Sequence, residues 1–188
     1  MPLIALCTAK IPPTTLSPIL SRAYKASERI HSSPNLFLLT TKDEDESQRY
    51  LADSITIPPI EGYIESPFLG WTVTQLASFL DGYASNTVID SSTFLVADEQ
   101  TAADGDTLLL VHNHNPNAQA EQGLASVRLS AKYAHSKAVA VSVASKDVIE
   151  LRNLGDGDGV FRGGSRASRG DGGEGVKGGK APRKKLGV

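Results

Sequence analysis

The composition of the chain changes abruptly at Arg162, and this change limits the part that can fold into a compact domain. Residues 162–188 hold 9 of the 17 glycines and carry 8 Lys and Arg against 2 Asp and Glu. Residues 1–161 carry 11 Lys and Arg against 19 Asp and Glu, so the net charge of −2 combines a body of −8 with a tail of +6. A segment so rich in glycine and charge buries too little apolar surface to offset the entropy lost on ordering it. We therefore expect a globular domain over residues 1–163 and a disordered basic tail over residues 164–188.

The positive tail predicts a negatively charged partner, which is either nucleic acid or an acidic protein surface. Arg162 has two interpretations: it packs back on the body beside Phe161, or it opens a tail that contacts RNA. The contact residues expected from the sequence are Arg162, Arg166, Arg169, Lys177, Lys180, Arg183, Lys184 and Lys185. The body, at −8, is expected to be repelled by nucleic acid, so this interpretation assigns any binding to the tail.

The sequence favours an intracellular protein, cytoplasmic or nuclear. A single cysteine, Cys7, excludes a framework of intramolecular disulfides, and no glycosylation acceptor occurs. No stretch approaches the ~18 consecutive apolar residues of a membrane span, and the first residues lack the pattern of a signal peptide. The first 40 residues resemble a mitochondrial transit peptide weakly, but a strand followed by a helix is the favoured interpretation. Their charged residues are Lys10, Arg22, Lys25, Glu28 and Arg29.

Hydrophobic patterning predicts an α/β domain with a mixed central sheet and flanking helices, with α+β as the alternative. The expected strands are Leu3–Cys7, Leu36–Thr40, Val88–Asp90, Phe94–Ala97, Thr107–His112, Leu124–Leu129 and Lys137–Ala144. The last of these is expected because its valines alternate with small residues, which would leave a face that a helix can approach closely.

Helices are expected wherever a capping pattern precedes an apolar periodicity. One runs from Thr14 or Thr15 to about Ile30, with Pro18 tolerable only near its start. Capping boxes at Thr41-x-x-Glu44 and Thr72-x-x-Gln75 predict two more, ending near Asp53 and at Asp81-Gly82. A final helix, over about Lys146–Leu154, is expected to be capped by Ser145.

Three body segments resemble the uncharacterised DUF6924 family of bacteria and fungi, over about residues 36–163. These segments are Gly70–Leu76, the strand pair around Asp90 and Phe94–Asp98, and Asp156–Gly163, whose Asp-Gly-Val-Phe-Arg-Gly run is the most specific. The resemblance implies an α/β fold and a domain boundary near Gly163. The family carries no known activity, so the resemblance implies no catalytic residues.

The tail holds a second, local resemblance. The stretch Gly178–Lys184 is similar to part of the N-terminal tail of the third core histone, and Leu186 keeps the spacing of that pattern. The resemblance implies that Lys180 and Lys184 match acetylated lysines and that Arg183 matches a methylated arginine. A generic basic tail for nucleic-acid contact or nuclear import is the favoured interpretation.

Few residues of the sequence are candidates for metal binding or catalysis. His112 and His114 share one face of an expected strand, and imidazole is a common metal ligand, with His135, Asp98 or Asp90 as a third candidate ligand. Surface histidines, replaceable by Ala within about 0.5 kcal/mol, are the favoured interpretation. Cys7, among apolar neighbours, is expected to be a buried structural thiol. No residue is assigned a catalytic role, and no cofactor is expected.

The sequence therefore predicts a non-enzymatic binding or adaptor protein whose basic tail contacts nucleic acid or chromatin proteins. The alternative is an enzyme or small-ligand-binding domain. Its site would lie near strand ends, in the loops at residues 57–71 and 112–117.

Overall fold

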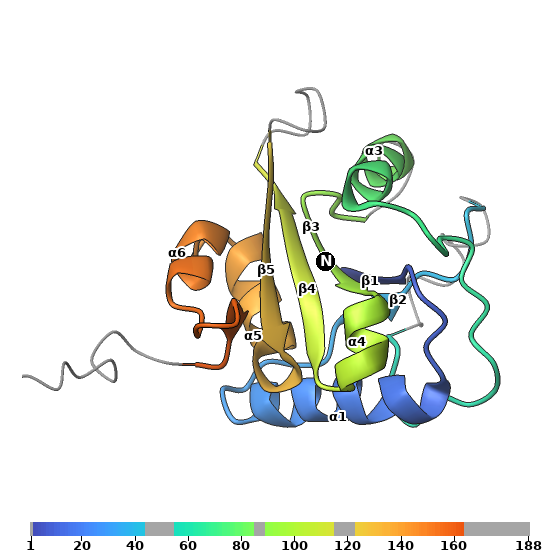
Figure 1. Cartoon of the computed structure of the whole chain (residues 1–188), viewed down its shortest axis with the longest axis horizontal. Coiled ribbons are helices and arrows are strands. Elements are labelled where there is room, and N and C mark those ends of the chain that lie inside the picture. Colours follow the sequence, from blue (N-terminus) through green and yellow to red (C-terminus); the bar gives the residue numbers. More distant parts are fainter. Residues whose placement is uncertain (1, 44–54, 85–88, 115–122, 164–188) are drawn as a thin grey trace, which may run out of the picture.

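The computed structural model describes residues 2–43, 55–84, 89–114 and 123–163, which form a mixed six-stranded sheet with helices on both faces (Figure 1). The strands are β1 (Leu3–Cys7), β2 (Leu36–Leu38), β3 (Thr93–Ala97), β4 (Thr107–Asn113), β5 (Leu124–Ser130) and β6 (Val160–Phe161). The helices are α1 (Pro13–Glu28), α3 (Val73–Ala84), α4 (Glu99–Asp104), α5 (Ala131–Ser142) and α6 (Val148–Asn153). The predicted α/β class with a mixed sheet is confirmed.

The strands lie in the order β2-β1-β3-β4-β5-β6. The first three are parallel, with Ile4 of β1 opposite Phe37 of β2 and Phe94 of β3. Strand β4 runs antiparallel to both of its neighbours, β3 and β5, and β6 is parallel to β5. Every residue of β1, β2 and β3 is buried, as expected for strands that are covered on both faces.

Side chains that alternate along the strands build two cores on opposite faces of the sheet. One face packs against α1, α5 and α6, through residues such as Ala5, Leu95 and Leu110. The other face packs against α3, through residues such as Leu6 and Val96. In Figure 1, α1 and α3 accordingly lie on opposite sides of β1.

The predicted strand at Lys137–Ala144 is wrong, because these residues belong mostly to α5. The buried positions of this segment recur with the spacing of a helix, at Ala131, Ala134, Ala138 and Val141. An alternation of valine and alanine matches the period of a strand over six residues, but alanine is the strongest helix former and the helical period extends further. The small side chains do allow a close approach, since α5 packs directly on α1.

Most other element predictions are confirmed, with shifted ends. The capping box at Thr72 is present: Thr72 N donates to Gln75 Oε1 over 2.8 Å and Gln75 N donates to Thr72 Oγ1 over 3.3 Å. Helix α3 continues to Ala84 instead of ending at Asp81-Gly82. Helix α6 is capped by Asp147, whose carboxylate accepts from Ile149 N, and not by Ser145.

Two expectations have a different outcome, and a third concerns residues outside the described part. Pro18 lies in the interior of α1, in its second turn. Ile89 and Asp90 are not in a strand, and Val88 lies outside the described residues. The helix expected after Thr41 falls on residues 44–54, which are also outside the described part.

Within the described residues, no helix combines the length and the hydropathy that crossing a lipid bilayer requires.

Enlarging Ala138, which is fully buried where α5 meets the core, should destabilise the fold. We expect Ala138→Leu to lower the free energy of unfolding by about 1–3 kcal/mol, because extra methyl groups force apart a packed interface. The matched control is Ala103→Leu, on the exposed side of α4, which should change it by less than about 0.5 kcal/mol. Denaturant titrations would measure both, and equal effects would contradict the packing described here.

Candidate anion-binding site

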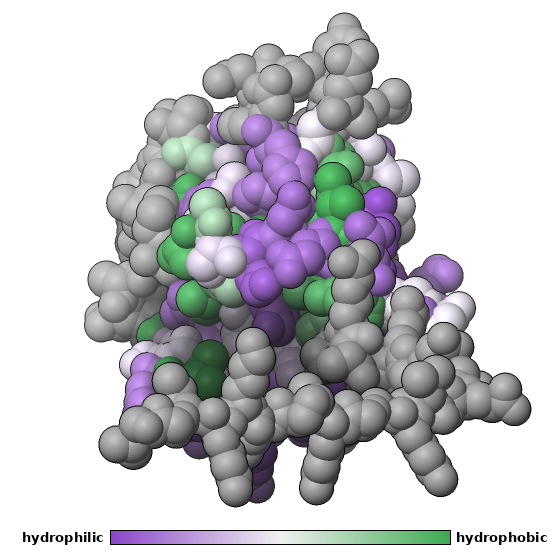
Figure 2. All heavy atoms as spheres, turned by 90° about the vertical axis from the view of Figure 1, so that its left-hand side faces the viewer, coloured by the Kyte–Doolittle hydropathy of each residue, from purple (hydrophilic) through white to green (hydrophobic). Residues whose placement is uncertain are grey.

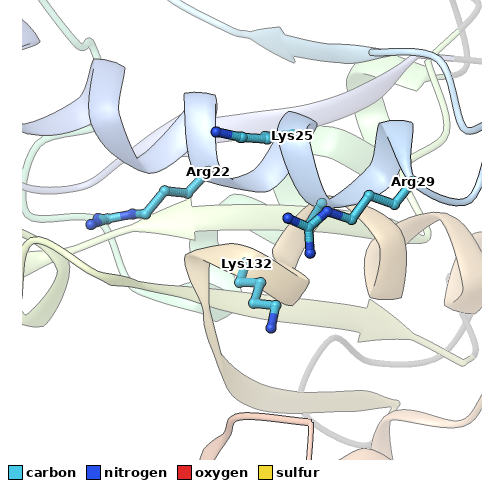
Figure 3. Close-up of a pocket in the computed structure, with 5 residues that line it drawn as sticks. Arg22, Lys25, Arg29 and Lys132 are labelled. Atoms are coloured by element: carbon cyan, nitrogen blue, oxygen red, sulfur yellow. The ribbon is translucent and has the colours of Figure 1, made fainter.

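The surface between α1 and α5 is hollowed by two adjoining cavities of about 280 and 480 Å³. Both cavities are lined by Ala26, Arg29 and Lys132, so together they form one groove along the two helices. We call this the basic groove, because its cationic lining residues are Arg22, Lys25, Arg29, Lys132, Lys137 and Lys146. Figure 3 shows Arg22, Lys25 and Arg29 projecting from successive turns of α1, with Lys132 on the first turn of α5 nearby.

The spacing of the cations along α1 determines which side of the helix they occupy. Arg22, Lys25 and Arg29 are separated by three and four residues, which brings them to one side of α1. They lie next to the stripe of buried residues, including Ile19 and Ala23, that anchors the helix on the sheet. The groove thus exists because α1 and α5 share a core and carry their long charged side chains at its rim.

The groove concentrates positive charge on an acidic body. Among the described residues, its lining includes six of the 11 Lys and Arg in residues 1–161 and no Asp or Glu. Arg22 is paired with Asp106 at 3.3 Å, and Lys146 with Glu150 at 2.9 Å. Within the described part of the chain, no ion pair is formed by the other four, which are Lys25, Arg29, Lys132 and Lys137.

Aromatic rings border the α5 side of the groove. Lys132 Nζ lies 5.2 Å from the centre of the Tyr133 ring, and Lys137 Nζ lies 5.6 Å from that of Phe161. The two rings meet edge to face, with centres 5.5 Å apart. Tyr133 is half-buried and lines the larger cavity, so part of its ring adjoins the groove. Cations beside an aromatic ring form a chemically suitable lining for phosphates and bases.

The surface on the side of α6 combines hydrophilic and hydrophobic areas. Figure 2, which views the molecule from the side that carries α6, shows hydrophilic residues through the middle of this surface. The visible hydrophobic areas lie to either side of them.

The two candidate metal ligands on β4 and just beyond it do lie together. The rings of His112 and His114 meet edge to face at 4.5 Å, beside a cavity of about 350 Å³ that Asp147 and Glu150 also line. His112 Nδ1 is 2.8 Å from Thr93 Oγ1, a fully buried hydroxyl. Burial, and then the neighbouring His114, lower the pKa of His112.

The proposed third ligands have other partners. His135 is fully buried, with Nδ1 2.7 Å from Ser27 Oγ and Nε2 2.6 Å from Asn35 Oδ1. Asp98 is paired with Arg128, and Asp90 accepts hydrogen bonds from Ser92. Among the described residues, no group of three or more His, Cys, Asp or Glu side chains is arranged to hold a metal ion.

Cys7 is a buried thiol at the end of β1, as predicted. Burial raises its pKa to about 12, which leaves almost no thiolate near neutral pH. A nucleophilic role for Cys7 has no support in this environment.

The structure does not bring together the two loops of the alternative ligand site. Ser66 Oγ donates to Cys7 O and Gly70 N donates to Thr8 O, so the end of the first loop lies at the carboxyl end of β1. His112 pairs with Thr93 at the amino end of β3, which is the opposite edge of the sheet because β1 and β3 are parallel. Residues 115–117 lie outside the described part of the chain.

Arg162 packs back on the body. Its guanidinium binds Asp156 at 3.2 Å and Asp158 at 2.7 Å, across the turn that leads into β6. The hydrogen bonds from Arg162 lower the pKa of Asp158 to about 2. The other tail residues assigned to partner contact, from Arg166 to Lys185, lie outside the described residues, as does the histone-like stretch.

The sequence model of a domain of unknown function, DUF6924, matches residues 35–164, which is more than half of the chain. The chain belongs to the DUF6924 family. The match confirms the resemblance seen at Gly70–Leu76 and Asp156–Gly163, and it begins after α1. No curated protein and no solved structure matches the chain. The family therefore identifies the domain without assigning it an activity.

The sequence did contain a signal for the basic groove. The three cations of α1 recur at helical spacing beside its apolar stripe, but the helix expected there was assigned only its apolar face, and the side that the cations share was given no role. Lys132 was missed because no element was predicted between the strands expected at Leu124–Leu129 and Lys137–Ala144, and Lys137 because it fell in the second of these strands. An α5 helix places both near α1, whereas a strand would not.

Acidification should destabilise the protein through His135. Burial lowers its pKa from 6.5 to about 4, so between these values the unfolded chain binds a proton that the folded chain excludes. Stability should fall as pH drops from 6.5 towards 4, by up to about 3 kcal/mol from this group. Chemical denaturation at several pH values should show a shallower dependence for His135→Gln than for the unchanged protein. His31→Gln, at an exposed residue after α1, is the control, and identical pH profiles for all three proteins would contradict the prediction.

The two neighbouring histidines should differ in their effect on stability. His112→Ala removes the hydrogen bond to the buried Thr93 hydroxyl, and we expect a loss of about 1–2 kcal/mol. This exceeds the limit of about 0.5 kcal/mol expected from the sequence, which His114→Ala should still satisfy. Thermal unfolding would compare the two variants, and an equal loss would show that the Thr93 contact contributes little.

Proposed function

We propose that this protein is a non-enzymatic nucleic-acid-binding protein whose basic groove holds the phosphate backbone. The observation that carries the proposal is the concentration of six cations, with no acid among the described lining residues, around one groove on a body of −8. The basic tail, at +6 over residues 162–188, adds a second cationic segment to the same chain. This proposal departs from the expectation that the body repels nucleic acid, which considered only its net charge.

Phosphate is a suitable ligand for the groove because of how its cations are held. Lys25, Arg29, Lys132 and Lys137 need not break an ion pair with a described residue before they bind an anion. Arg29 offers a planar fork of donors for phosphate oxygens, and the lysines offer mobile point charges. Arg22 is already held by Asp106 and by the carbonyl of Gly105, so it contributes a fixed donor at one end.

A linear polyanion suits the groove better than a single small anion. The cations of α1 extend over residues 22–29, or about 10 Å of helix, and continue onto α5. Phosphates recur at about 3.4 Å along a stacked strand, so several can face the groove together. The exposed part of Tyr133 gives a base a ring to stack on.

Removing cations of the groove that form no ion pair with a described residue should weaken the binding of nucleic acid and reduce the salt dependence of this binding. We expect Lys25→Gln, Arg29→Gln and Lys132→Gln together to flatten the log–log salt slope by about 2, since each phosphate contact on a single strand contributes about 0.7. Fluorescence anisotropy with the full chain and labelled oligothymidylate, over a range of salt concentrations, would measure this slope. The control with equal charge change is Lys10→Gln, Lys42→Gln and Arg152→Gln, at cations that do not line the groove.

Three measurements distinguish binding of nucleic acid by the groove from binding by the tail and from binding of acidic polypeptides. A groove variant that behaves like the control would overturn the proposal. The tail variant Arg183→Gln, Lys184→Gln and Lys185→Gln shows how much of the binding belongs to the tail. Displacement of oligothymidylate by polyglutamate at equal charge concentration would show that the groove binds acidic polypeptides, and this too would contradict the proposal.

A further inference from the structure

The two cavities of the basic groove differ in the residues that line them. The lining of the smaller cavity is Ala26 with the cations Arg22, Lys25, Arg29 and Lys132. The larger cavity, of about 480 Å³, also has an apolar surface, which is formed by Ala26, Ile30, Tyr133 and Ala140. We call this surface the apolar pocket. The groove therefore combines a half that suits an anion with a half that suits an apolar group.

Ile30 contributes to the pocket from the end of α1. It directly follows Arg29, the C-cap of the helix, and 62% of its surface is exposed. Among the described residues it belongs to neither of the two cores that stabilise the sheet. A large apolar side chain on the wall of a cavity offers contact surface to a ligand. The fold thus leaves Ile30 available for such a contact.

Tyr133 contributes to the pocket from α5 and is held in place by residues on its other side. The edge-to-face contact with Phe161 supports its ring. Gly163, with a φ of +88°, lies against its hydroxyl end: a Cβ at this position would come within 2.2 Å of Cζ and Oη of Tyr133. A ring that is already fixed loses little side-chain entropy when a ligand packs on it.

Two cations connect the halves of the groove. Arg29 and Lys132, both drawn in Figure 3, line both cavities. A nucleotide with its base in the apolar pocket would have its phosphate near these two residues, because one sugar joins base and phosphate. The next phosphate would face Arg22 and Lys25 in the smaller cavity. The order of apolar and cationic groups along the groove thus suits the order of groups in a nucleic-acid strand.

We propose that the apolar pocket holds one unpaired base, so that the protein selects single strands over duplexes. This inference rests on the proposed function and names the form of nucleic acid that the groove takes. In a duplex each base is stacked and paired, and it would have to be flipped out before it could enter the pocket.

The pocket should accept different bases. The hydroxyls of Ser136 and Ser145, which also line the larger cavity, already donate to the carbonyls of Tyr133 and Ala140. Apolar contact, and not these hydroxyls, would therefore hold the base. Contact with the face of a base is tolerant of sequence, because every base has such a face.

The first test compares oligothymidylate with a strand of equal length in which every nucleotide is abasic. The two strands carry the same phosphates, and we expect the full chain to bind the abasic strand about 10-fold more weakly. Ile30→Ser changes no charge, and it should weaken the binding of oligothymidylate by about 3- to 5-fold while leaving that of the abasic strand within about 1.5-fold. Fluorescence anisotropy at a fixed salt concentration would measure each affinity. The matched control is Ile57→Ser, at a residue that is 65% exposed and does not line the groove, and it should change neither affinity.

A second variant fills the pocket instead of trimming it. Ala140→Leu adds methyl groups at a half-buried position of the lining, so it should weaken the binding of oligothymidylate and not that of the abasic strand. Unchanged binding of the abasic strand also shows that the variant is folded. The groove variant Lys25→Gln, Arg29→Gln and Lys132→Gln should weaken both strands by the same factor, because both carry the phosphates that these cations bind.

The duplex of oligothymidylate and oligoadenylate gives the last comparison. Its bases are paired, so Ile30→Ser should leave its binding unchanged. Equal affinities for oligothymidylate and the abasic strand, or equal effects of Ile30→Ser on the single strand and the duplex, would overturn this inference and leave phosphate binding in the groove intact. If the groove variant binds oligothymidylate and the abasic strand normally, the proposed function itself fails.

Discussion

Helices α1 and α5 lie against each other because alanines of α5, among them Ala134 and Ala138, are fully buried where the helices share the core. Beside these alanines, the buried His135 joins Ser27, near the end of α1, to Asn35, which precedes β2. Small contact residues bring the two backbones close, so the longer side chains outside the contact surround a narrow space. Packing that covers one face of the sheet thus also creates the basic groove, and disruption of the core there would disrupt the groove.

The sheet was largely predictable from the sequence, because strands such as Leu3–Cys7 and Leu124–Ser130 are apolar runs bounded by turns. The second half of α5 was not predictable from the sequence. Over so short a segment, its valines and alanines fit both the period of a strand, which is two residues, and the period of a helix, which is 3.6 residues. Tertiary packing favours the helical period, because α5 packs on the sheet beside α1. A strand at this place would have no neighbouring strand to pair with. The groove depended on this choice, because its cations converge only when both helices are in place. His135 gave no sequence signal that distinguishes a buried hydrogen-bonded histidine from a metal ligand.

The family match and the folded unit do not coincide. DUF6924 begins at residue 35, yet β1 lies between β2 and β3 and pairs with both. Without β1, these two strands would lose their shared neighbour and Leu6 would be missing from the core beside α3. The groove is divided in the same way, with Arg22, Lys25 and Arg29 before the matched segment and the α5 lysines within it. Membership of the family therefore does not by itself imply the groove; the first 34 residues of this chain complete both the sheet and the site.

An acidic body and an anion-binding groove are compatible because electrostatic interactions at a surface are local. At physiological ionic strength, charges more than about 8 Å apart are largely screened from each other. A phosphate in the groove would be close to Arg29 and Lys132, whereas some acids of the body are paired elsewhere, such as Asp98 with Arg128 and Asp156 with Arg162. Under the proposed function, the acids away from the groove would disfavour anions on the remaining surface and would thereby direct a strand to the groove. Lower ionic strength lengthens the range of this repulsion as well as of the attraction, so the proposed binding would depend on salt in its orientation and not only in its strength.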